Sequence, residues 1–330
     1  MNKNELKILI RWKHKSMKRI VPVLFVFLFA CANQSKDEAK VIIFHAGSLS
    51  LPLKQMERAF EEKYPGIDVQ LEGAGSVACA RKITDLKRDC DIMASADYTV
   101  IDEMLIPGYT SNNIQFASNE MVIAYSDRSE RADEITIDSW PDILMDKDVI
   151  YGRSDPDSDP CGYRSVMTMK LADIYYGRND ITDSLLKKDR NMIRPKEVDL
   201  VALLQTGVID YFFIYRSVAE QHKLKYIELP PEINLSDPDF NYLYSEVSVE
   251  IRGKSPDDTI EMRGGEMIYG ICILDKSKDK EEVIEFMKYF LGEEGRSVIE
   301  RNGQGVIFPP RVNRLEALPA ALHHFFSTGQ

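Results

Sequence analysis

The 330-residue sequence predicts an α/β protein of two lobes, each a sheet flanked by helices. Three observations predict this class. Short apolar strands alternate with helices from residue 41 to residue 94, which is the pattern of a parallel, doubly wound sheet. A second alternating series begins at Met121. The stiff Pro230-Pro231 connector ends that series, and the later elements most simply return to the first sheet and complete it.

Hydrophobic periodicity gives the elements of the first lobe. Leu53, Met56 and Phe60 recur at helical spacing until Pro65-Gly66 ends the helix. The expected elements are a strand at 41–46, a helix from 49, an alternating strand at 67–71, a helix at 77–86 and a strand at 92–94.

The second lobe is expected at 121–232, and the first lobe at 41–120 and 233–330. Two lobes joined by crossing strands form a ligand cleft that hinge motion closes. The later expected elements are strands at 121–125, 149–151, 211–214 and 226–229, helices at 163–176, 195–205 and 217–222, and, beyond the connector, a segment at 244–251, a strand at 268–274 and a helix at 280–291.

The N-terminus has the features of an export signal. Basic residues precede an apolar run at 20–30 that is too short to span a bilayer. The run ends in Leu28-Phe29-Ala30-Cys31, which resembles the lipobox of bacterial lipoproteins. We therefore expect a signal peptide at 1–31, a lipidated Cys31 and a polar tether at 32–40. Met17 is an alternative start, and an uncleaved anchor is the alternative to cleavage.

Charge argues against nucleic acid as a partner. The whole chain has a net charge of −11, and removal of residues 1–31 takes away seven basic residues and one acidic residue, which leaves −17. Nucleic-acid binding needs a basic surface, whereas a small anion can be held by neutral dipoles. The other four cysteines have no metal-type spacing, and we expect them to be buried thiols, although export permits a disulfide.

Two Gly-Ser pairs, Gly47-Ser48 and Gly75-Ser76, lie 28 residues apart where expected strands give way to helices. A helix N-terminus presents unpaired N–H groups and a positive dipole end, so each turn is suited to an anion. Together they suggest one anion held by two consecutive turns. The alternative is that both serines only cap their helices.

The second lobe offers a third helix start and further polar residues. Asp159 and Pro160 are typical of an N-cap and a first helical position, and Cys161 follows them. Glu197 is expected in the first turn of a helix, where dipole compensation alone would explain it. A core position would explain Tyr215. These residues are therefore open to a structural interpretation when each is taken alone.

Five motifs taken together resemble the archaeal-type tungstate/molybdate-binding proteins of ABC importers, a branch of the periplasmic binding-protein superfamily with a type II fold. The resemblance runs from Val41 to about Pro310. The motifs occur in the order His45-Ala46-Gly47-Ser48-Leu49, Gly73-Ala74-Gly75-Ser76-Val77, Ala94-Ser95-Ala96-Asp97-Tyr98, Asp159-Pro160-Cys161-Gly162-Tyr163-Arg164-Ser165 and Ile214-Tyr215-Arg216-Ser217-Val218-Ala219-Glu220-Gln221-His222.

The resemblance implies an exported, lipid-anchored, monomeric binding protein that delivers tungstate or molybdate to an ABC permease and needs no cofactor. It implies that Asp159 and Glu197 raise the metal of the oxyanion from four to six oxygen neighbours. Asp199 and Glu220 are competitors for the place of Glu197. The implied ligand-binding residues are Gly47, Ser48, Ser76, Asp159, Pro160, Cys161, Glu197 and Tyr215.

Carboxylates fit a metal oxyanion better than sulfate or phosphate. A buried carboxylate repels those anions, whereas a hard, high-valent metal favours oxygen ligands. Another oxyanion remains the first alternative. The second is an enzyme that uses Ser48 with His45, but these residues are three apart across a tight turn and no ordering acid is evident. We expect His45 to be a packing or hydrogen-bonding residue.

Overall fold

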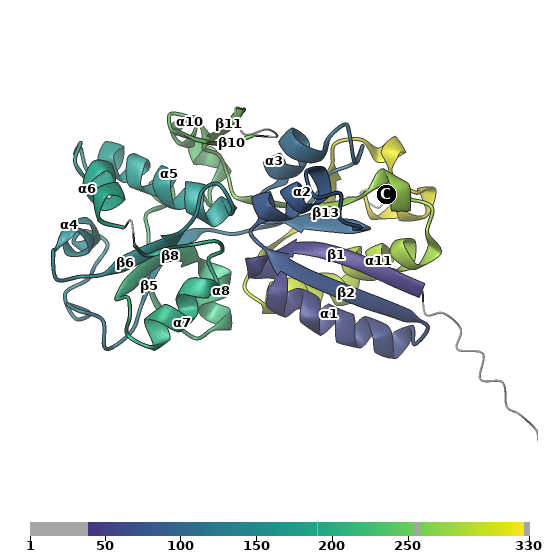
Figure 1. Cartoon of the computed structure of the whole chain (residues 1–330), viewed down its shortest axis with the longest axis horizontal. Helices are drawn as coiled ribbons and strands as arrows, with labels where there is room; N and C mark the ends of the chain where they lie inside the picture. Colours follow the sequence, from purple (N-terminus) through teal and green to yellow (C-terminus); the bar gives the residue numbers. More distant parts are fainter. Residues whose placement is uncertain (1–38, 190, 254–257, 327–330) are drawn as a thin grey trace, which may run out of the picture. The chain divides into compact units, whose positions relative to one another are not determined.

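The computed structural model describes residues 39–189, 191–253 and 258–326, all of which belong to one structural unit (Figure 1). The predicted signal peptide, Cys31 and tether residues 32–38 lie outside the described residues. Within the described ranges, no helix is long and apolar enough to cross a membrane.

One sheet has six strands in the order β13-β4-β12-β3-β1-β2. Strand β1 pairs in parallel with β2 and β3, whereas β12 runs antiparallel to β3 and β4. Its strands are β1 (Ala39–Ala46), β2 (Ile67–Ala74), β3 (Ile92–Ser95), β4 (Ile114–Ser118), β12 (Ile268–Ile273) and β13 (Gly305–Val312).

The other large sheet has five strands in the order β7-β6-β8-β5-β9. Strands β6 and β8 are parallel, and β5 runs antiparallel to β8 and β9. Its strands are β5 (Met121–Tyr125), β6 (Tyr151–Ser154), β7 (Ile193–Arg194), β8 (Tyr211–Tyr215) and β9 (Lys225–Glu228). Below, the first and second lobes are the elements grouped around the six-stranded and five-stranded sheets.

Helices cover both sheets, and in Figure 1 α1 and α2 lie on different sides of β1. The first lobe has α1 (Ser50–Lys63), α2 (Ser76–Thr84), α3 (Tyr98–Val100), α11 (Glu281–Leu291) and α12 (Glu293–Arg301). The second lobe has α4 (Trp140–Met145), α5 (Pro160–Tyr175), α6 (Ile181–Lys188), α7 (Asp199–Gln205) and α8 (Arg216–Gln221). Short helices α9 (Pro231–Asn234) and α10 (Asn241–Tyr244) and the antiparallel pair β10 (Ser248–Arg252) and β11 (Thr259–Arg263) connect the second lobe back to β12.

The predicted α/β class of two helix-flanked sheets is confirmed, and the later strands do return to the first sheet. The lobe boundaries at 120 and 232 remain a prediction. Three local expectations were wrong. The strand expected at 149–151 is instead formed by Tyr151–Ser154. Helix α7 begins at Asp199, so Glu197 lies in the turn before it, where the N–H of Leu200 bonds the Glu197 carbonyl three residues back instead of four. The segment at 244–251 divides between the end of α10 and most of β10.

Candidate functional site

The first lobe supplies two buried serines at the carboxyl ends of β1 and β2. Ser48 lies in the 3₁₀ turn Gly47–Leu49, and its Oγ accepts a hydrogen bond of 3.0 Å from the hydroxyl of Tyr269. Ser76 is the first residue of α2, and its Oγ accepts a bond of 3.0 Å from the N–H of Ala96. Neither hydroxyl caps its helix, so the capping interpretation is wrong. Each hydroxyl hydrogen is left to point toward another acceptor.

Asp159 joins two segments of the second lobe. It is the N-cap of α5, as expected, and its Oδ1 accepts from the N–H of Cys161 at 3.4 Å. Its Oδ2 accepts from the N–H of Glu197 at 3.0 Å. Pro160 occupies the first helical position. The carboxylate of Asp159 therefore fixes the turn that carries Glu197 beside the start of α5.

Glu197 is a fully buried carboxylate without a hydrogen-bonding partner for its side chain. Its side chain has 0% exposure, and neither oxygen meets a donor among the described residues. A Cβ atom at Gly47 would lie 2.9 Å and 3.0 Å from these two oxygens. The carboxylate therefore lies against the Ser48 turn of the first lobe. A side chain at position 47 would displace this carboxylate.

The two carboxyl groups perturb each other. Burial raises the pKa of Asp159, although its backbone hydrogen bonds oppose this effect. Burial, and then the neighbouring charge of Asp159, raise the pKa of Glu197 well above its ordinary value. Burial of two neighbouring acids is costly to folding. Such an arrangement is typical of a functional site rather than of a structural core.

The start of α2 contacts the loop before α5. The carbonyl oxygen of Ser158 accepts a hydrogen bond of 3.0 Å from the N–H of Ala78. A Cβ atom at Gly75 would overlap that carbonyl oxygen and would lie 2.9 Å from the Cβ of Asp159. Gly47 contacts Glu197, and Gly75 contacts the Asp159 loop. The two lobes are therefore closed on each other at both Gly-Ser turns.

The other predicted site residues are buried nearby but already have partners. Tyr215 ends β8, and its hydroxyl accepts a bond of 3.3 Å from Nη1 of Arg164. The Cys161 thiol donates to the carbonyl of Phe213 at 3.7 Å, and burial raises the pKa of that thiol. The four cysteines of the described residues, Cys79, Cys90, Cys161 and Cys272, are buried free thiols.

The competing acids lie outside this cluster. Asp199 is half-buried and paired with Lys196 at 3.6 Å, and Glu220 is exposed and faces Arg216 at 3.8 Å. Of the three acids, Glu197 is therefore the one that faces the Gly-Ser turns.

His45 has the packing role that the sequence suggested. Its Nδ1 lies 2.8 Å from the carbonyl oxygen of Ala46, and its ring lies 2.8 Å from where a Gly73 Cβ would stand. Burial lowers the pKa of His45, which favours the neutral ring.

Two supporting residues were missed by sequence reasoning. Tyr269 on β12 binds the Ser48 hydroxyl, and the side-chain amide of Gln304 donates to the Ser48 carbonyl at 3.2 Å. Both are more than 220 residues from Ser48 along the chain. No local pattern could have associated either residue with that serine.

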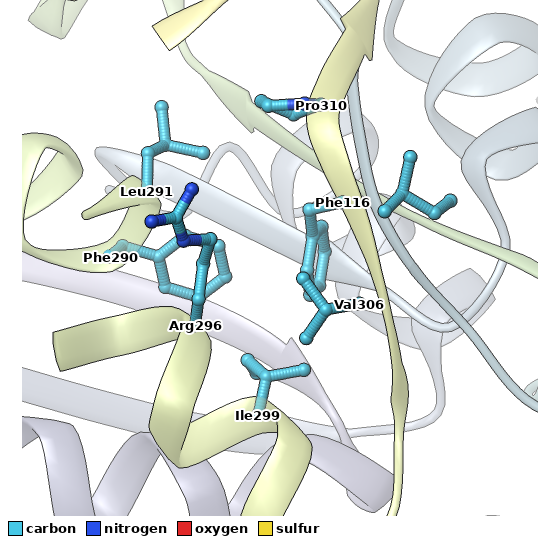
Figure 2. A pocket seen from close by; sticks show the side chains of 8 residues that line it. Phe116, Phe290, Leu291, Arg296, Ile299, Val306 and Pro310 are labelled. Carbon is cyan, nitrogen blue, oxygen red and sulfur yellow. The ribbon is translucent and has the colours of Figure 1, made fainter. Parts of the chain in front are cut away.

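Hollows away from the cluster have different properties. One in the first lobe is apolar and holds only about 10 Å³, the least that a single water molecule needs. Figure 2 shows Phe116, Phe290, Ile299 and Val306 around it, beside Arg296. A larger groove of about 550 Å³ runs past Asp97, Glu266 and Arg311. No group of three or more His, Cys, Asp or Glu side chains suited to a metal ion occurs in the part of the chain that the structure describes.

Comparisons with known proteins agree with this architecture. A solute-binding protein of Petrotoga mobilis is 45% identical over 321 residues, which cover 96% of this chain and 99% of the relative. The molybdate/tungstate-binding protein WtpA of Thermococcus kodakarensis is 44% identical and covers 88% of this chain and 90% of its own length. The periplasmic molybdate-binding protein of Azotobacter vinelandii shares the fold with a TM-score of 0.59 at 14% identity, over 80% of this chain and 98% of that protein.

A match to a protein-family model identifies the family of the chain. The model for bacterial extracellular solute-binding proteins matches residues 41–304, which contain both sheets except the first two residues of β1 and the whole of β13. That range includes both Gly-Ser turns and the Asp159–Glu197 pair. The chain belongs to the family of bacterial extracellular solute-binding proteins.

Proposed function

We propose that this chain captures tungstate or molybdate between its lobes and delivers the oxyanion to an ABC permease. The observation that carries the proposal is the buried pair of Asp159 and Glu197, which lies against Gly75 and Gly47, the glycines that precede Ser76 and Ser48. The name of the Thermococcus relative supports it. The same features favour a binding protein over an enzyme, because His45 is engaged with its own backbone neighbour.

In the proposed site, neutral donors and charged side chains have different roles. Ser48 and Ser76 donate to the oxygens of the anion, while Asp159 and Glu197 approach its metal centre. Metal–oxygen bonds offset the cost of burying two carboxylates, whereas sulfate and phosphate offer no centre that accepts carboxylate ligands. Rejection of those anions by buried acids gives specificity that size alone cannot. The proposed ligand-binding set is Gly47, Ser48, Ser76, Asp159, Pro160, Cys161, Glu197 and Tyr215.

Parallel titration with tungstate, molybdate, sulfate and phosphate tests the function. We expect stoichiometric heat of binding and a raised melting temperature with tungstate and molybdate only. A ligand at a hundred times its Kd stabilises the folded protein by about 2.7 kcal/mol, which thermal unfolding detects easily. Equal binding of sulfate would instead support the alternative function, a binder of another oxyanion. Helix N-termini alone are enough for such binding.

We also propose that the protein is a monomer held to a membrane by lipid on Cys31. Replacement of Cys31 by serine is expected to release the protein from the membrane fraction, because several acyl chains anchor firmly and none would remain. The matched control is Cys90→Ser, which changes a buried thiol in the first lobe. Membrane association of Cys31→Ser equal to that of the control would contradict the anchor.

A further inference from the structure

A second buried polar cluster joins the lobes beside the proposed oxyanion site. Nη1 of Arg164 donates to the carbonyl of Ala96 at 2.7 Å, and Nη2 of Arg164 pairs with Oδ2 of Asp97 at 3.0 Å. The Tyr163 hydroxyl donates to the same Oδ2 at 2.7 Å. The side chains of Arg164 and Asp97 are only 4% and 10% exposed. These four residues are called the cross-lobe cluster below.

The first lobe holds its half of the cluster without help from the second. Oδ1 of Asp97 accepts from the N–H and the hydroxyl of Thr99, at 3.0 Å and 2.8 Å. Ser95 bonds the backbone of Asp97 from the other side. These contacts fix the turn after β3 and direct Oδ2 toward the second lobe. The bonds that Arg164 and Tyr163 make to this turn all cross between lobes and need closure.

The same turn touches the proposed oxyanion site. The N–H of Ala96 donates to Oγ of Ser76, while the carbonyl of Ala96 accepts from Arg164. Arg164 also donates to the hydroxyl of Tyr215, and its guanidinium lies 5.9 Å from the centre of that ring. Arg164 thus binds the residue that orients Ser76 and also binds Tyr215.

We infer that Arg164, assisted by Tyr163, is a positioning residue that holds the lobes closed and slows release of the bound oxyanion. The inference rests on the proposed function, since it takes closure around an oxyanion as given. A buried ion pair gains little net free energy, because burial costs both charges their hydration. The cluster therefore does not keep the lobes closed by itself. It adds stability to a closed state that the ligand has already favoured.

The test measures how fast bound tungstate leaves. Protein loaded with tungstate is mixed with excess molybdate, and the tungsten that remains bound is measured after rapid desalting at successive times. We expect Arg164→Met to raise the release rate about tenfold or more, because it removes charged hydrogen bonds made only on closure. Tyr163→Phe removes one hydroxyl and is expected to raise the rate severalfold. Arg164→Lys, which keeps the charge but not the two-pronged contact, should fall between Arg164→Met and the wild type.

A matched control separates this role from ordinary stability. Asp91 is a buried acid bonded within the first lobe to Ile42, Ser277 and Lys280. Asp91→Asn is expected to lower the melting temperature of the ligand-free protein while leaving the release rate unchanged. Tyr163→Phe should leave the melting temperature of the ligand-free protein unchanged and raise the release rate, because its cross-lobe bond is lost whenever the lobes open.

Two outcomes would overturn the inference. One is an unchanged release rate in Tyr163→Phe and in either Arg164 variant. The other is a release rate that rises only in proportion to the loss of ligand-free stability, as in a merely structural role. A wild-type chain that binds sulfate but not tungstate would refute the proposed function alone. The same comparison would then be made with bound sulfate, and it would still decide the role of Arg164.

Discussion

Glu197→Gln is expected to weaken tungstate binding about a hundredfold or more and to erode the rejection of sulfate. Removal of one member of a buried charge pair costs about 2–5 kcal/mol at protein interfaces, and a loss of about 2.7 kcal/mol is a hundredfold in Kd. The amide keeps the size of the side chain but cannot act as an anionic ligand to the metal. Sulfate binding becomes stronger in this variant because one repelling charge has been removed.

The same variant is expected to make the ligand-free closed protein more stable at pH 7. Burial and Asp159 raise the pKa of Glu197, so the folded chain holds this proton more tightly than the unfolded chain does. The cost of ionising it is absent below the ordinary carboxyl range, grows as pH rises to the raised pKa, and is complete above that pKa. Glutamine has no charge to bury and avoids the cost.

Calorimetric titration and thermal unfolding measure these two effects. Glu220→Gln is the matched control, because Glu220 is an exposed acid beside Arg216 and the same chemical change there should alter neither quantity much. Wild-type affinity and wild-type sulfate rejection in Glu197→Gln would mean that this carboxylate is not a ligand.

Gly75→Ala is expected to prevent full closure and to reduce affinity for tungstate about a hundredfold. The backbone of Gly75 has φ −60° and ψ 145°, which alanine adopts without strain. The new methyl group would overlap the carbonyl oxygen of Ser158 and press on Asp159. The Asp159 loop would have to move away from α2. At a preorganised site, an acid displaced by even about 1 Å loses most of its contribution to binding affinity.

Gly66→Ala is the control for this change, since a Cβ atom there would meet nothing within 4 Å. Ligand-free melting temperatures close to wild type in both variants, with weakened binding in Gly75→Ala alone, are the expected result. Tungstate binding of Gly75→Ala at wild-type strength would show that the closed contact between the lobes is not needed.

Local chemistry explains which parts of the fold were predictable. Periodicity marked β1, α1 and β2, and the Asp159-Pro160 pair marked the start of α5. Strand β13 was missed because it contains Pro309-Pro310, which argues against a strand interior. It lies at the edge of its sheet, where proline is tolerated.

The site was predictable only in part. The sequence indicated the Gly-Ser turns as anion sites, and resemblance supplied Glu197. Its burial against Gly47 depends on the approach of two segments 150 residues apart, which no local pattern encodes. Support of Ser48 by Tyr269 and Gln304 is long-range in the same way. The contacts of Arg164 with Ala96 and Asp97 likewise join segments more than 60 residues apart in the chain.

X-ray absorption at the tungsten edge of the tungstate-loaded protein tests the central claim most directly. The carboxylates of Asp159 and Glu197 should bring the number of oxygen neighbours around tungsten to six, and Glu197→Gln should lower that number. A spectrum of four short, equal tungsten–oxygen bonds, unchanged in Glu197→Gln, would contradict ligation by the two acids.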